Sequence, residues 1–129
     1  MKDCIFCKIA NGSIPANTVY EDELVKVFMD ANPVSEGHLL IVPKHHYTDI
    51  NEMPIGMLTH CMEISKKMFK GLKETLNVDG LTLTQNNEYG QEVKHYHLHL
   101  IPRYIGDNIN FNHKDNRNTI DDVFKKLSK

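Results

Sequence analysis

The chain has 129 residues, of which 40% are hydrophobic and 25% are charged, and its formal net charge at pH 7 is −2. This length suits one domain with a substantial hydrophobic core, so we expect residues 1–129 to fold as a single domain. The slight excess of acidic residues argues against nonspecific binding to nucleic acid or to an acidic membrane surface.

The start of the chain and its apolar segments indicate a cytoplasmic protein. The first residues contain no apolar run of the length that a secretory signal needs. The longest aliphatic run, residues 39–42, is far too short to span a bilayer. We therefore expect a protein of the cytoplasm that does not enter the membrane and whose three cysteines are reduced.

Two of the cysteines, Cys4 and Cys7, form a closely spaced pair near the start of the chain. In a reducing compartment such a pair is half of a metal site, a redox pair or a coincidence. A tetrahedral zinc site needs two further ligands. A thioredoxin-like pair lies between a strand and a helix, whereas this pair precedes every strand that the sequence predicts, so redox chemistry is disfavoured.

Five segments have the composition and the bounding turns of β-strands. Residues 18–20 and 24–28 flank an acidic turn and predict a hairpin. A third strand, residues 37–43, ends at a proline, and a short polar turn separates the fourth strand from the fifth. The last two strands are therefore expected to pair antiparallel; they are residues 81–85 and the histidine-rich run of residues 90–102.

Residues 54–77 predict one long helix, because apolar residues recur there at alternating steps of three and four. The apolar stripe is wide enough to cover a sheet and also to contact a partner helix. Periodicity then disappears in the polar residues 106–118. A short amphipathic helix follows in residues 119–127, with acidic residues in its first turn and lysines in its last, as the helix dipole favours. Residues 104–129 are thus expected to form a C-terminal loop and short helix.

The histidine-rich run carries His95, His97 and His99 at alternate positions. In a strand, alternate side chains share a face and lie roughly 6–7 Å apart, so the three imidazoles would form a row that can line one small anionic group. Each buried imidazole needs a hydrogen-bond partner, which argues against an incidental row. A catalytic zinc site made of all three conflicts with this spacing, because the outer two rings are too far apart to share a metal.

The run that begins at His95 resembles the His-x-His-x-His signature of the histidine-triad family. Residues 28–33 and 37–46 resemble a second block of that family, and residues 86–91 resemble the loop before its triad. Together these segments cover most of residues 4–103 in the family's order and spacing. The resemblance implies an α+β fold, a five-stranded antiparallel sheet with one long helix, here with short terminal helices, and a two-fold homodimer.

That family transfers or hydrolyses nucleotides at the α-phosphate through a nucleotidyl-histidine intermediate. The resemblance therefore implies a hydrolase or nucleotidyltransferase of purine nucleotides, acting on nucleoside phosphoramidates or dinucleoside polyphosphates and leaving an AMP-type product. It makes His97 the nucleophile, a role that suits a neutral imidazole. It also implies that His99 and His38 stabilise charge on the phosphate oxygens.

Further residues match positions that bind the nucleotide in the family. Asp30 matches a position that contacts the ribose hydroxyls, although a turn-capping role fits the sequence alone equally well. Asn86 and Gln91 match positions that orient the phosphate or the leaving group. Phe28 and Ile14 are candidates for the pocket that holds the base.

One branch of the family binds zinc through a Cys-x-x-Cys pair and two histidines. Carried over to this chain, the resemblance implies Cys4, Cys7, His46 and His95 as the ligands. Two thiolates and two imidazoles complete a tetrahedral set, so the zinc would be structural and would join the N-terminus to the catalytic strand. In the alternative, both thiols are free and His95 is hydrogen-bonded to the backbone.

One position departs from the family pattern. Glu92 follows Gln91 where a serine or threonine often assists the leaving group. A carboxylate beside phosphates is unfavourable unless it is protonated or turned away, so leaving-group assistance is unassigned. The departure is consistent with a preference for a basic leaving group, such as an amine.

The main alternative function is a noncatalytic, zinc-stabilised nucleotide-binding or sensor protein. The presence of His97 together with His99 and His38 favours the enzyme instead. The remaining histidines are expected at the surface without a role; they are His45, His60 and His113.

Overall fold

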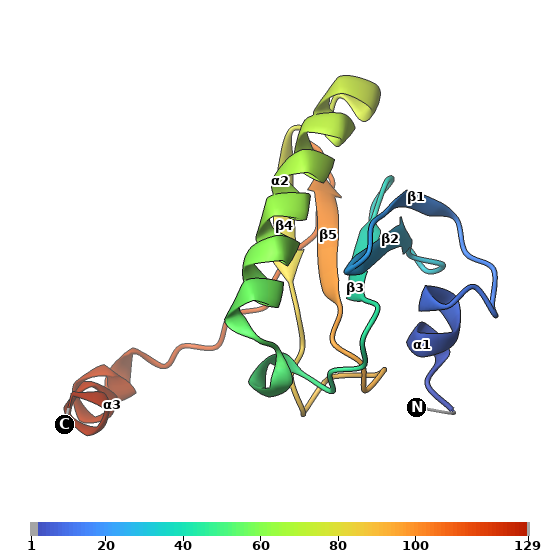
Figure 1. Ribbon diagram of the computed structural model, residues 1–129. Helices are drawn as coiled ribbons and strands as arrows, with labels where there is room; N and C mark the ends of the chain where they lie inside the picture. Colours follow the sequence, from blue (N-terminus) through green and yellow to red (C-terminus); the bar gives the residue numbers. More distant parts are fainter. Residues whose placement is uncertain (1–2, 129) are drawn as a thin grey trace.

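The computed structural model describes residues 3–128, which form one antiparallel sheet with a helix on each face (Figure 1). The strands are β1 (Thr18–Glu21), β2 (Val25–Met29), β3 (Leu39–Pro43), β4 (Gly80–Thr84) and β5 (Leu98–Arg103), and the helices are α1 (Ile5–Ala10), α2 (Ile55–Leu76) and α3 (Ile120–Leu127). The strand order is β1-β2-β3-β5-β4, and every neighbouring pair is antiparallel. This confirms the α+β class and the five-stranded sheet.

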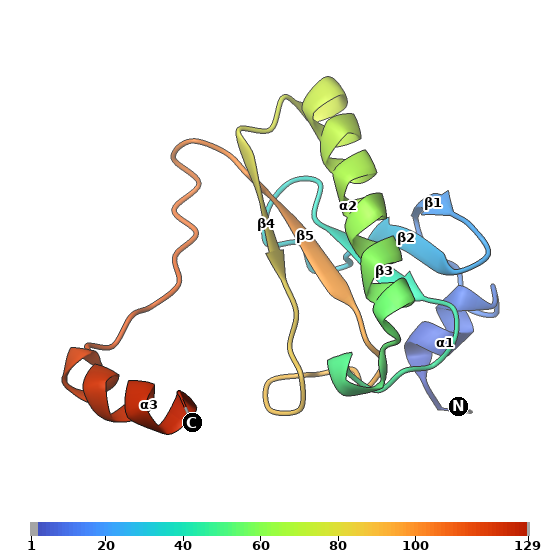
Figure 2. The same cartoon turned by 60° about the vertical axis from the view of Figure 1, so that its left-hand side comes forward.

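The long helix α2 lies across one face of the sheet and forms the larger core with it (Figures 1 and 2). Alternate side chains of β2 and β3 point to this face, so Val27 and Ile41 are fully buried there. The chain enters α2 after Pro54 and leaves it at Asn77, which adopts the left-handed conformation common at helix ends. These bounds confirm the helix predicted at residues 54–77.

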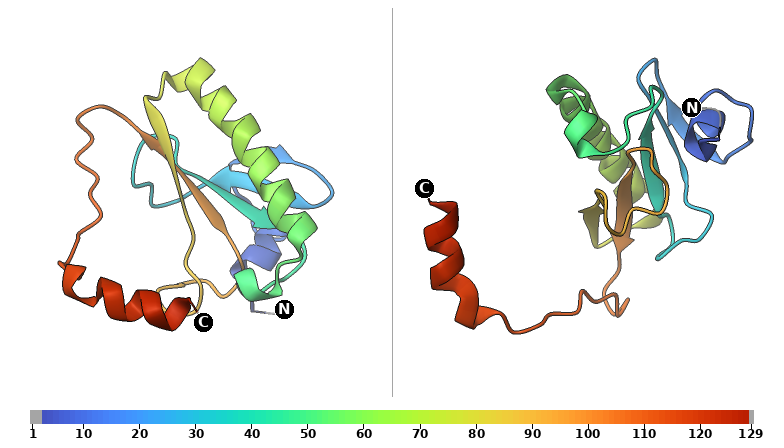
Figure 3. Two further views of the ribbon diagram at one scale, coloured as in Figure 1. Left: turned by 90° about the vertical axis from the view of Figure 1, so that its left-hand side faces the viewer. Right: turned by 90° about the horizontal axis from the view of Figure 1, so that it is seen from below.

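The short helix α1 covers the opposite face, so the sheet lies between α1 and α2 (Figure 3). Phe6 and Ile9 of α1 pack on Phe28 and Leu40, strand residues that alternate with those of the larger core. Cys4, immediately before α1, packs against the same cluster. The smaller core therefore fixes the N-terminal cysteine pair beside the sheet.

The histidine-rich run is a strand only in its second half, which corrects the prediction. β5 begins at Leu98, and the first two histidines of the triad precede it in irregular backbone. The amide of Tyr96 donates to the carbonyl of Tyr47 at 2.7 Å rather than to a neighbouring strand. The carbonyl of Pro43, at the end of β3, accepts a hydrogen bond from the ring of His95 at 2.8 Å. The His95 ring thus bonds to a carbonyl that a backbone amide of β5 would otherwise use, and the pairing of β3 with β5 ends at Leu98.

The chain leaves the sheet at Arg103, and its C-terminal part extends away from the body (Figures 1 and 2). The guanidinium of Arg103 donates to both carboxylate oxygens of Asp107 and to the carbonyl of Ile109, so the first residues of this part are held. Residues 110–128 are exposed throughout. α3 confirms the short helix predicted at residues 119–127.

Two further expectations concern the surroundings of the chain. Across residues 3–128 no helix combines the length and the hydrophobicity needed to cross a membrane. The sheet ends at β4, whose outer edge has no strand partner within the same described part of the chain. An open edge suits pairing with a second copy. The homodimer stays a prediction, as does the treatment of residues 1–129 as a single domain.

Candidate active site and metal centre

Four side chains from separate segments converge beside α1. Cys4 and Cys7 flank the start of the helix, His46 follows β3, and His95 precedes β5. One ligand atom from each lies within 4.8 Å of the other three, and we call these residues the thiol–histidine cluster. His95 Nδ1 lies 3.3 Å from Cys4 Sγ, 3.4 Å from Cys7 Sγ and 3.1 Å from His46 Nδ1. The His46 Nδ1 atom is also 3.3 Å from Cys7 Sγ.

These distances suit the separations between neighbouring ligand atoms in a tetrahedral zinc site. Zinc bonds of about 2.3 Å to sulfur and about 2.0 Å to nitrogen place neighbouring ligand atoms about 3.3–3.8 Å apart. The measured separations of 3.1–3.4 Å lie at or just below that range. His95 Nε2 donates its proton to Pro43, which leaves the Nδ1 lone pair directed at the other ligands. The cluster could therefore hold a metal ion.

The protonation states of the cluster also suit a cation. Burial lowers the pKa of His95 to about 4, although the hydrogen bond to Pro43 opposes this shift. Burial also lowers the pKa of His46, so both rings are neutral at pH 7 and free to bind a metal. Burial and the neighbouring Cys4 raise the pKa of Cys7. A metal would reverse that effect on the thiol, and its binding would release protons.

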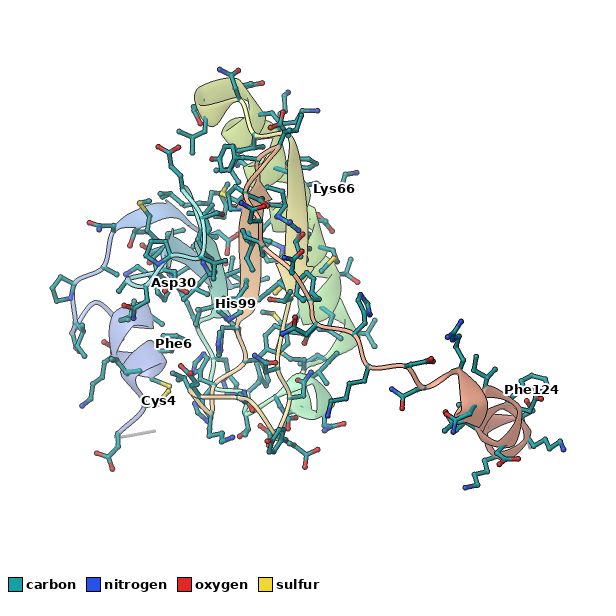
Figure 4. All side chains as sticks on the ribbon, turned by 180° about the vertical axis from the view of Figure 1, so that it is seen from behind. Cys4, Phe6, Asp30, Lys66, His99 and Phe124 are labelled. Carbon is teal, nitrogen blue, oxygen red and sulfur yellow. The ribbon has the colours of Figure 1, made fainter. Side chains whose placement is uncertain are left out.

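A cavity of about 730 Å³ lies beside this cluster. Apolar side chains of α1, β2 and β3 form part of its lining, and polar groups of the loop between β4 and β5 form another part. We call it the histidine cavity (Figure 4 labels Phe6, Asp30 and His99 of its lining). Of the predicted site residues, the following line it: Phe28, Asp30, His38, Asn86, His97 and His99.

His97 is buried, and its ring is held in one orientation. Its Nδ1 donates to the backbone carbonyl of His95 at 2.8 Å. This bond assigns the ring proton to Nδ1 and leaves a free lone pair on Nε2, the form that a nucleophile requires. Phe6 packs edge-on against the ring, with centroids 5.0 Å apart. The ring of His99 is also 5.0 Å away, closer than in a regular strand, because the segment before β5 is irregular.

Asp30, His38 and His99 form a second polar group, the carboxylate–histidine cluster. The amide of Val34 donates to His38 Nδ1 at 3.0 Å, which assigns the proton of that buried ring to Nε2. His38 Nε2 in turn faces His99 Nδ1 at 2.9 Å and Asp30 Oδ2 at 3.4 Å. Because His99 Nδ1 accepts a hydrogen bond from Nε2–H of His38, the proton of His99 lies on its own Nε2, where it is available to an oxygen in the cavity.

Burial keeps the rings of this second cluster neutral. It lowers the pKa of His99 to about 4, with help from His97 and His38 and against the attraction of Asp30. It also lowers the pKa of His38, again against Asp30. The three ligand atoms lie within 4.8 Å of one another, but they do not suit a metal. The Val34 amide already uses the Nδ1 lone pair of His38, so Nε2 would have to lose its proton to bind a cation.

Other predicted site residues occupy different positions. Asp30 Oδ1 accepts the amide of Asn32 at 2.8 Å, so it caps a turn, while Oδ2 faces the cluster. Ile14 packs on the smaller core and does not line the cavity. Gln91 is buried, and its side chain donates to the carbonyl of Thr48 at 2.6 Å. Gln91 therefore holds the loop in place and lies outside the cavity lining.

The sequence reasoning missed three groups that orient the histidines. Phe6 contacts His97, and the carbonyl of Pro43 and the amide of Val34 fix the protons of His95 and His38. Phe6 lies between the two cysteines, so its position beside a ligand set was a usable signal. The two backbone groups leave no trace in the residue types, because any residue supplies a carbonyl and any residue except proline supplies an amide.

The remaining histidines divide into two kinds. His45 and His113 are exposed, as expected. His60 is half-buried and corrects the expectation, because its Nε2 lies 2.7 Å from Asp22 Oδ2 and joins α2 to the turn between β1 and β2. Burial alone would raise the pKa of Asp22, but hydrogen bonds from the backbone, Tyr20 and His60 lower it to about 2.

The fold and the two clusters together define a histidine-triad protein, and the comparisons agree. The HIT domain family profile matches residues 11–106. An uncharacterised HIT-like protein of Methanocaldococcus jannaschii is 47% identical over 128 residues, covering 96% of this chain and 98% of that protein. An adenosine 5′-monophosphoramidase of Saccharomyces cerevisiae is 40% identical over 102 residues, covering 78% of this chain and 62% of the yeast protein. The chain belongs to the HIT family.

Solved structures share the fold. A HIT family protein from Bacillus anthracis superposes with a TM-score of 0.86 at 35% identity, covering 98% of this chain and 95% of that chain. A zinc-bound histidine triad family protein from Mycobacterium smegmatis superposes with a TM-score of 0.81 at 29% identity, covering 98% and 96% of the two chains. Both confirm the HIT-like architecture.

Proposed function

We propose that this protein hydrolyses purine nucleotides at the α-phosphate through a nucleotidyl-histidine intermediate on His97. The substrates are nucleoside phosphoramidates or dinucleoside polyphosphates. The observation that carries the proposal is the hydrogen bond from His97 Nδ1 to the carbonyl of His95. It leaves a nucleophilic Nε2 in a cavity that also holds His99 as a donor. The name of the yeast relative, an adenosine 5′-monophosphoramidase, supports an AMP-type substrate.

The reaction has two displacement steps. In the first, the lone pair of His97 Nε2 attacks the α-phosphorus, and an N–P bond forms as the bond to the leaving group breaks. The leaving group keeps that electron pair, and an amine leaving group takes a proton from solvent. The His95 carbonyl meanwhile accepts a hydrogen bond from Nδ1–H and so stabilises the now positively charged ring, which keeps that proton. In the second step water attacks phosphorus, the N–P bond breaks, AMP forms and the proton returns to solvent.

The neighbouring residues have separate tasks in this scheme. The His99 Nε2 proton meets the charge that develops on a nonbridging phosphate oxygen. His38 fixes the tautomer of His99 and therefore acts as a positioning residue. Asp30 offers Oδ2 to the ribose, Asn86 orients the phosphate, and Phe28 lines the base pocket. Gln91 acts indirectly, through the loop that it holds to Thr48, and Ile14 acts through the core below α1.

We also propose that Cys4, Cys7, His46 and His95 hold a structural zinc ion. A four-ligand site leaves no open position for substrate, so zinc would supply stiffness and no acid–base chemistry. Its effect on the reaction would pass through His95, whose ring is a ligand and whose carbonyl orients His97. The zinc-bound relative from Mycobacterium smegmatis supports this assignment.

Two properties of the whole protein belong to the same proposal. The open edge of β4 and the partly exposed apolar strip of α2 support a homodimer. A nucleotide hydrolase of this kind fits the cytoplasm, with purine nucleotides as its partners and with neither nucleic acid nor membrane among them. Light scattering of the purified protein tests the dimer directly.

Mass spectrometry tests the covalent mechanism. The protein is mixed briefly with adenosine 5′-phosphoramidate, beside a His97→Ala variant and a His45→Ala control in the exposed loop. We expect a transient adduct of one adenylyl group in the wild type and the control, and none in His97→Ala. The steady-state rate of His97→Ala should fall by about 10⁴-fold or more, as for other deleted nucleophiles.

Two other outcomes would redirect the assignment. An adduct on His97→Ala would place the nucleophile elsewhere. Binding of AMP by the wild type without adduct or turnover, over all substrates of the proposed classes, would favour the noncatalytic, zinc-stabilised nucleotide-binding or sensor protein. Calorimetry with AMP separates binding from turnover in that case.

A further inference from the structure

A second cavity of about 600 Å³ adjoins the histidine cavity. The two share a wall, because Ile5, Glu92 and Val93 line both of them. Beyond that wall the second cavity is lined by Asp3, Cys4, His46, Thr48 and Lys94. It therefore lies between the thiol–histidine cluster and the loop that carries Glu92, and the reaction described above makes no use of it.

The lining that the two cavities share places this second space beside the 86–92 loop. The histidine cavity is lined by apolar side chains that include Phe28, by Asp30 and the histidines, and by residues of the 86–92 loop. A nucleotide that lays its base on Phe28 and its phosphorus at His97 directs its leaving group to the remaining part of the lining. That part includes Glu92, an exposed residue that also lines the second cavity.

The charges around the two cavities disfavour an anionic leaving group. Asp30 and Glu92 line the histidine cavity, and Asp3 adds a carboxylate to the second one. Among the described residues that line either cavity, Lys94 is the one lysine or arginine. Its Nζ already donates to the carbonyls of Glu88 and Gln91, at 3.0 and 2.8 Å. A polyphosphate entering this space would meet carboxylates and a lysine that is already engaged.

We propose that the second cavity is the leaving-group subsite, and that Glu92 makes it select amine leaving groups that carry a positive charge over polyphosphates. This inference rests on the proposed function and specifies its substrate class as AMP phosphoramidates of extended, cationic amines. The first step forms the His97–phosphorus bond and breaks the phosphorus–nitrogen bond of the substrate. The amine leaves with that electron pair and a proton from solvent, beside the Glu92 carboxylate.

Matched substrates test the charge preference. One phosphoramidate joins AMP to propylamine and another joins it to 1,3-diaminopropane, whose second amine stays protonated. The ratio of kcat/KM for the cationic substrate to that for the neutral one is measured within each variant, so differences in folded fraction cancel. We expect the wild-type ratio to exceed one. It should fall about fivefold in Glu92→Gln and about tenfold in Glu92→Lys, and half-molar salt should weaken it in the wild type.

Two controls separate the subsite from general effects. Glu88→Gln removes a carboxylate from the same loop but from neither cavity lining, and its ratio should match the wild type. Thr48→Trp fills the second cavity while keeping the backbone carbonyl that holds Gln91. It should slow both amine substrates relative to adenosine 5′-phosphoramidate, whose leaving group is ammonia. The matched variant Thr59→Trp, on the exposed side of α2, should leave these relative rates unchanged.

The outcomes distinguish this inference from the proposed function. Wild-type turnover of adenosine 5′-phosphoramidate with a charge ratio that Glu92→Gln does not alter would overturn the subsite and leave the enzyme intact. Faster turnover of diadenosine triphosphate than of either amine substrate would overturn it as well. Failure of the wild type on every substrate would count against the proposed function itself.

Discussion

The thiol–histidine cluster and the carboxylate–histidine cluster are built alike but are suited to different chemistry. Each joins histidines from distant parts of the chain through contacts near 3 Å, and each has one buried histidine, His95 or His38, among half-buried partners. The difference lies in the backbone group that contacts each ring. The Pro43 carbonyl accepts a hydrogen bond from Nε2–H of His95, which leaves the lone pair on Nδ1, whereas the Val34 amide donates to Nδ1 of His38, which leaves the proton on Nε2. One cluster is therefore suited to a cation and the other to an oxyanion.

His95 links the two regions. Its ring belongs to the thiol–histidine cluster, and its carbonyl accepts a hydrogen bond from Nδ1–H of His97 in the histidine cavity. Phe6 provides a second link, because it contacts the rings of both His95 and His97. A change at the proposed metal centre should therefore reach His97, the proposed nucleophile, through two residues. The comparison yields predictions that separate the two regions.

The largest effect should follow from removing the metal. Cys7→Ser, or treatment of the wild type with a strong chelator, should lower the melting temperature by about 10 °C, because bound zinc stabilises only the folded chain. Elemental analysis of the purified wild type should show one zinc per chain and none in Cys7→Ser. Cys61→Ala is the control for zinc content and should keep one zinc per chain, since Cys61 is buried in the larger core, outside the thiol–histidine cluster, with a pKa raised to about 11 by burial. If a chelator left the wild-type melting curve unchanged, the thiol–histidine cluster would not hold a structural metal.

The second cluster should respond in activity rather than in metal content. His38→Asn keeps an acceptor for the Val34 amide but loses the proton that fixes the His99 tautomer. We expect kcat to fall by about 10- to 100-fold, as for other residues that orient a catalytic group, with zinc content unchanged. Steady-state kinetics and elemental analysis on one preparation give both quantities. A loss of zinc in this variant would show that the two regions are not independent.

The sequence predicted the elements of the site better than it predicted their orientation. Hydrophobic periodicity was enough for α2, and turn residues located the strands. The alternate spacing of His95, His97 and His99 placed them together but also suggested a longer strand than β5. Strand length depends on ladder partners, and here the carbonyl of Pro43 bonds to a histidine ring instead.

The orientation of each ring depends on contacts that no local pattern encodes. Gln91 matched a nucleotide-binding position, yet its side chain bonds to Thr48, which is 43 residues away in the chain. His60 has Glu63 one turn further along α2, yet it pairs with Asp22 across 38 residues. Such pairs arise when α2 and the loops pack on the sheet, so they follow from tertiary structure.

The pH dependence of stability should sharpen the contrast further. The folded-state pKa of His99 is about 4, below the ordinary value near 6.5, so between these two pH values the unfolded chain binds the additional proton. The contribution of neutral His99 to the free energy of unfolding should therefore be complete above pH 6.5. It should decrease as the pH falls through this window. The slope is up to about 1.4 kcal/mol per pH unit for each such histidine.

Urea denaturation in the presence of a chelator, at intervals between pH 4 and 7.5, measures this slope without the contribution of metal binding. His99→Asn should reduce the slope of unfolding free energy against pH by the contribution of one histidine. His113→Asn, in the exposed segment, should leave the slope unchanged. Equal slopes in the wild type and His99→Asn would mean that His99 titrates normally in the folded protein. The neutral donor assigned to it would then be wrong at mildly acidic pH.

The smallest effect should come from the C-terminal part of the chain, whose residues 110–128 are exposed throughout and line neither cavity. A chain ended after residue 109 keeps the bonds from Arg103 to Asp107 and Ile109 but loses α3 and the exposed residues before it. We expect its free energy of unfolding to change by less than about 0.5 kcal/mol, as for other changes at exposed positions. Its zinc content and its turnover of adenosine 5′-phosphoramidate should match the full chain. A larger loss, accompanied by a lower mass in light scattering, would show that the exposed apolar residues of α3 pack on a second copy.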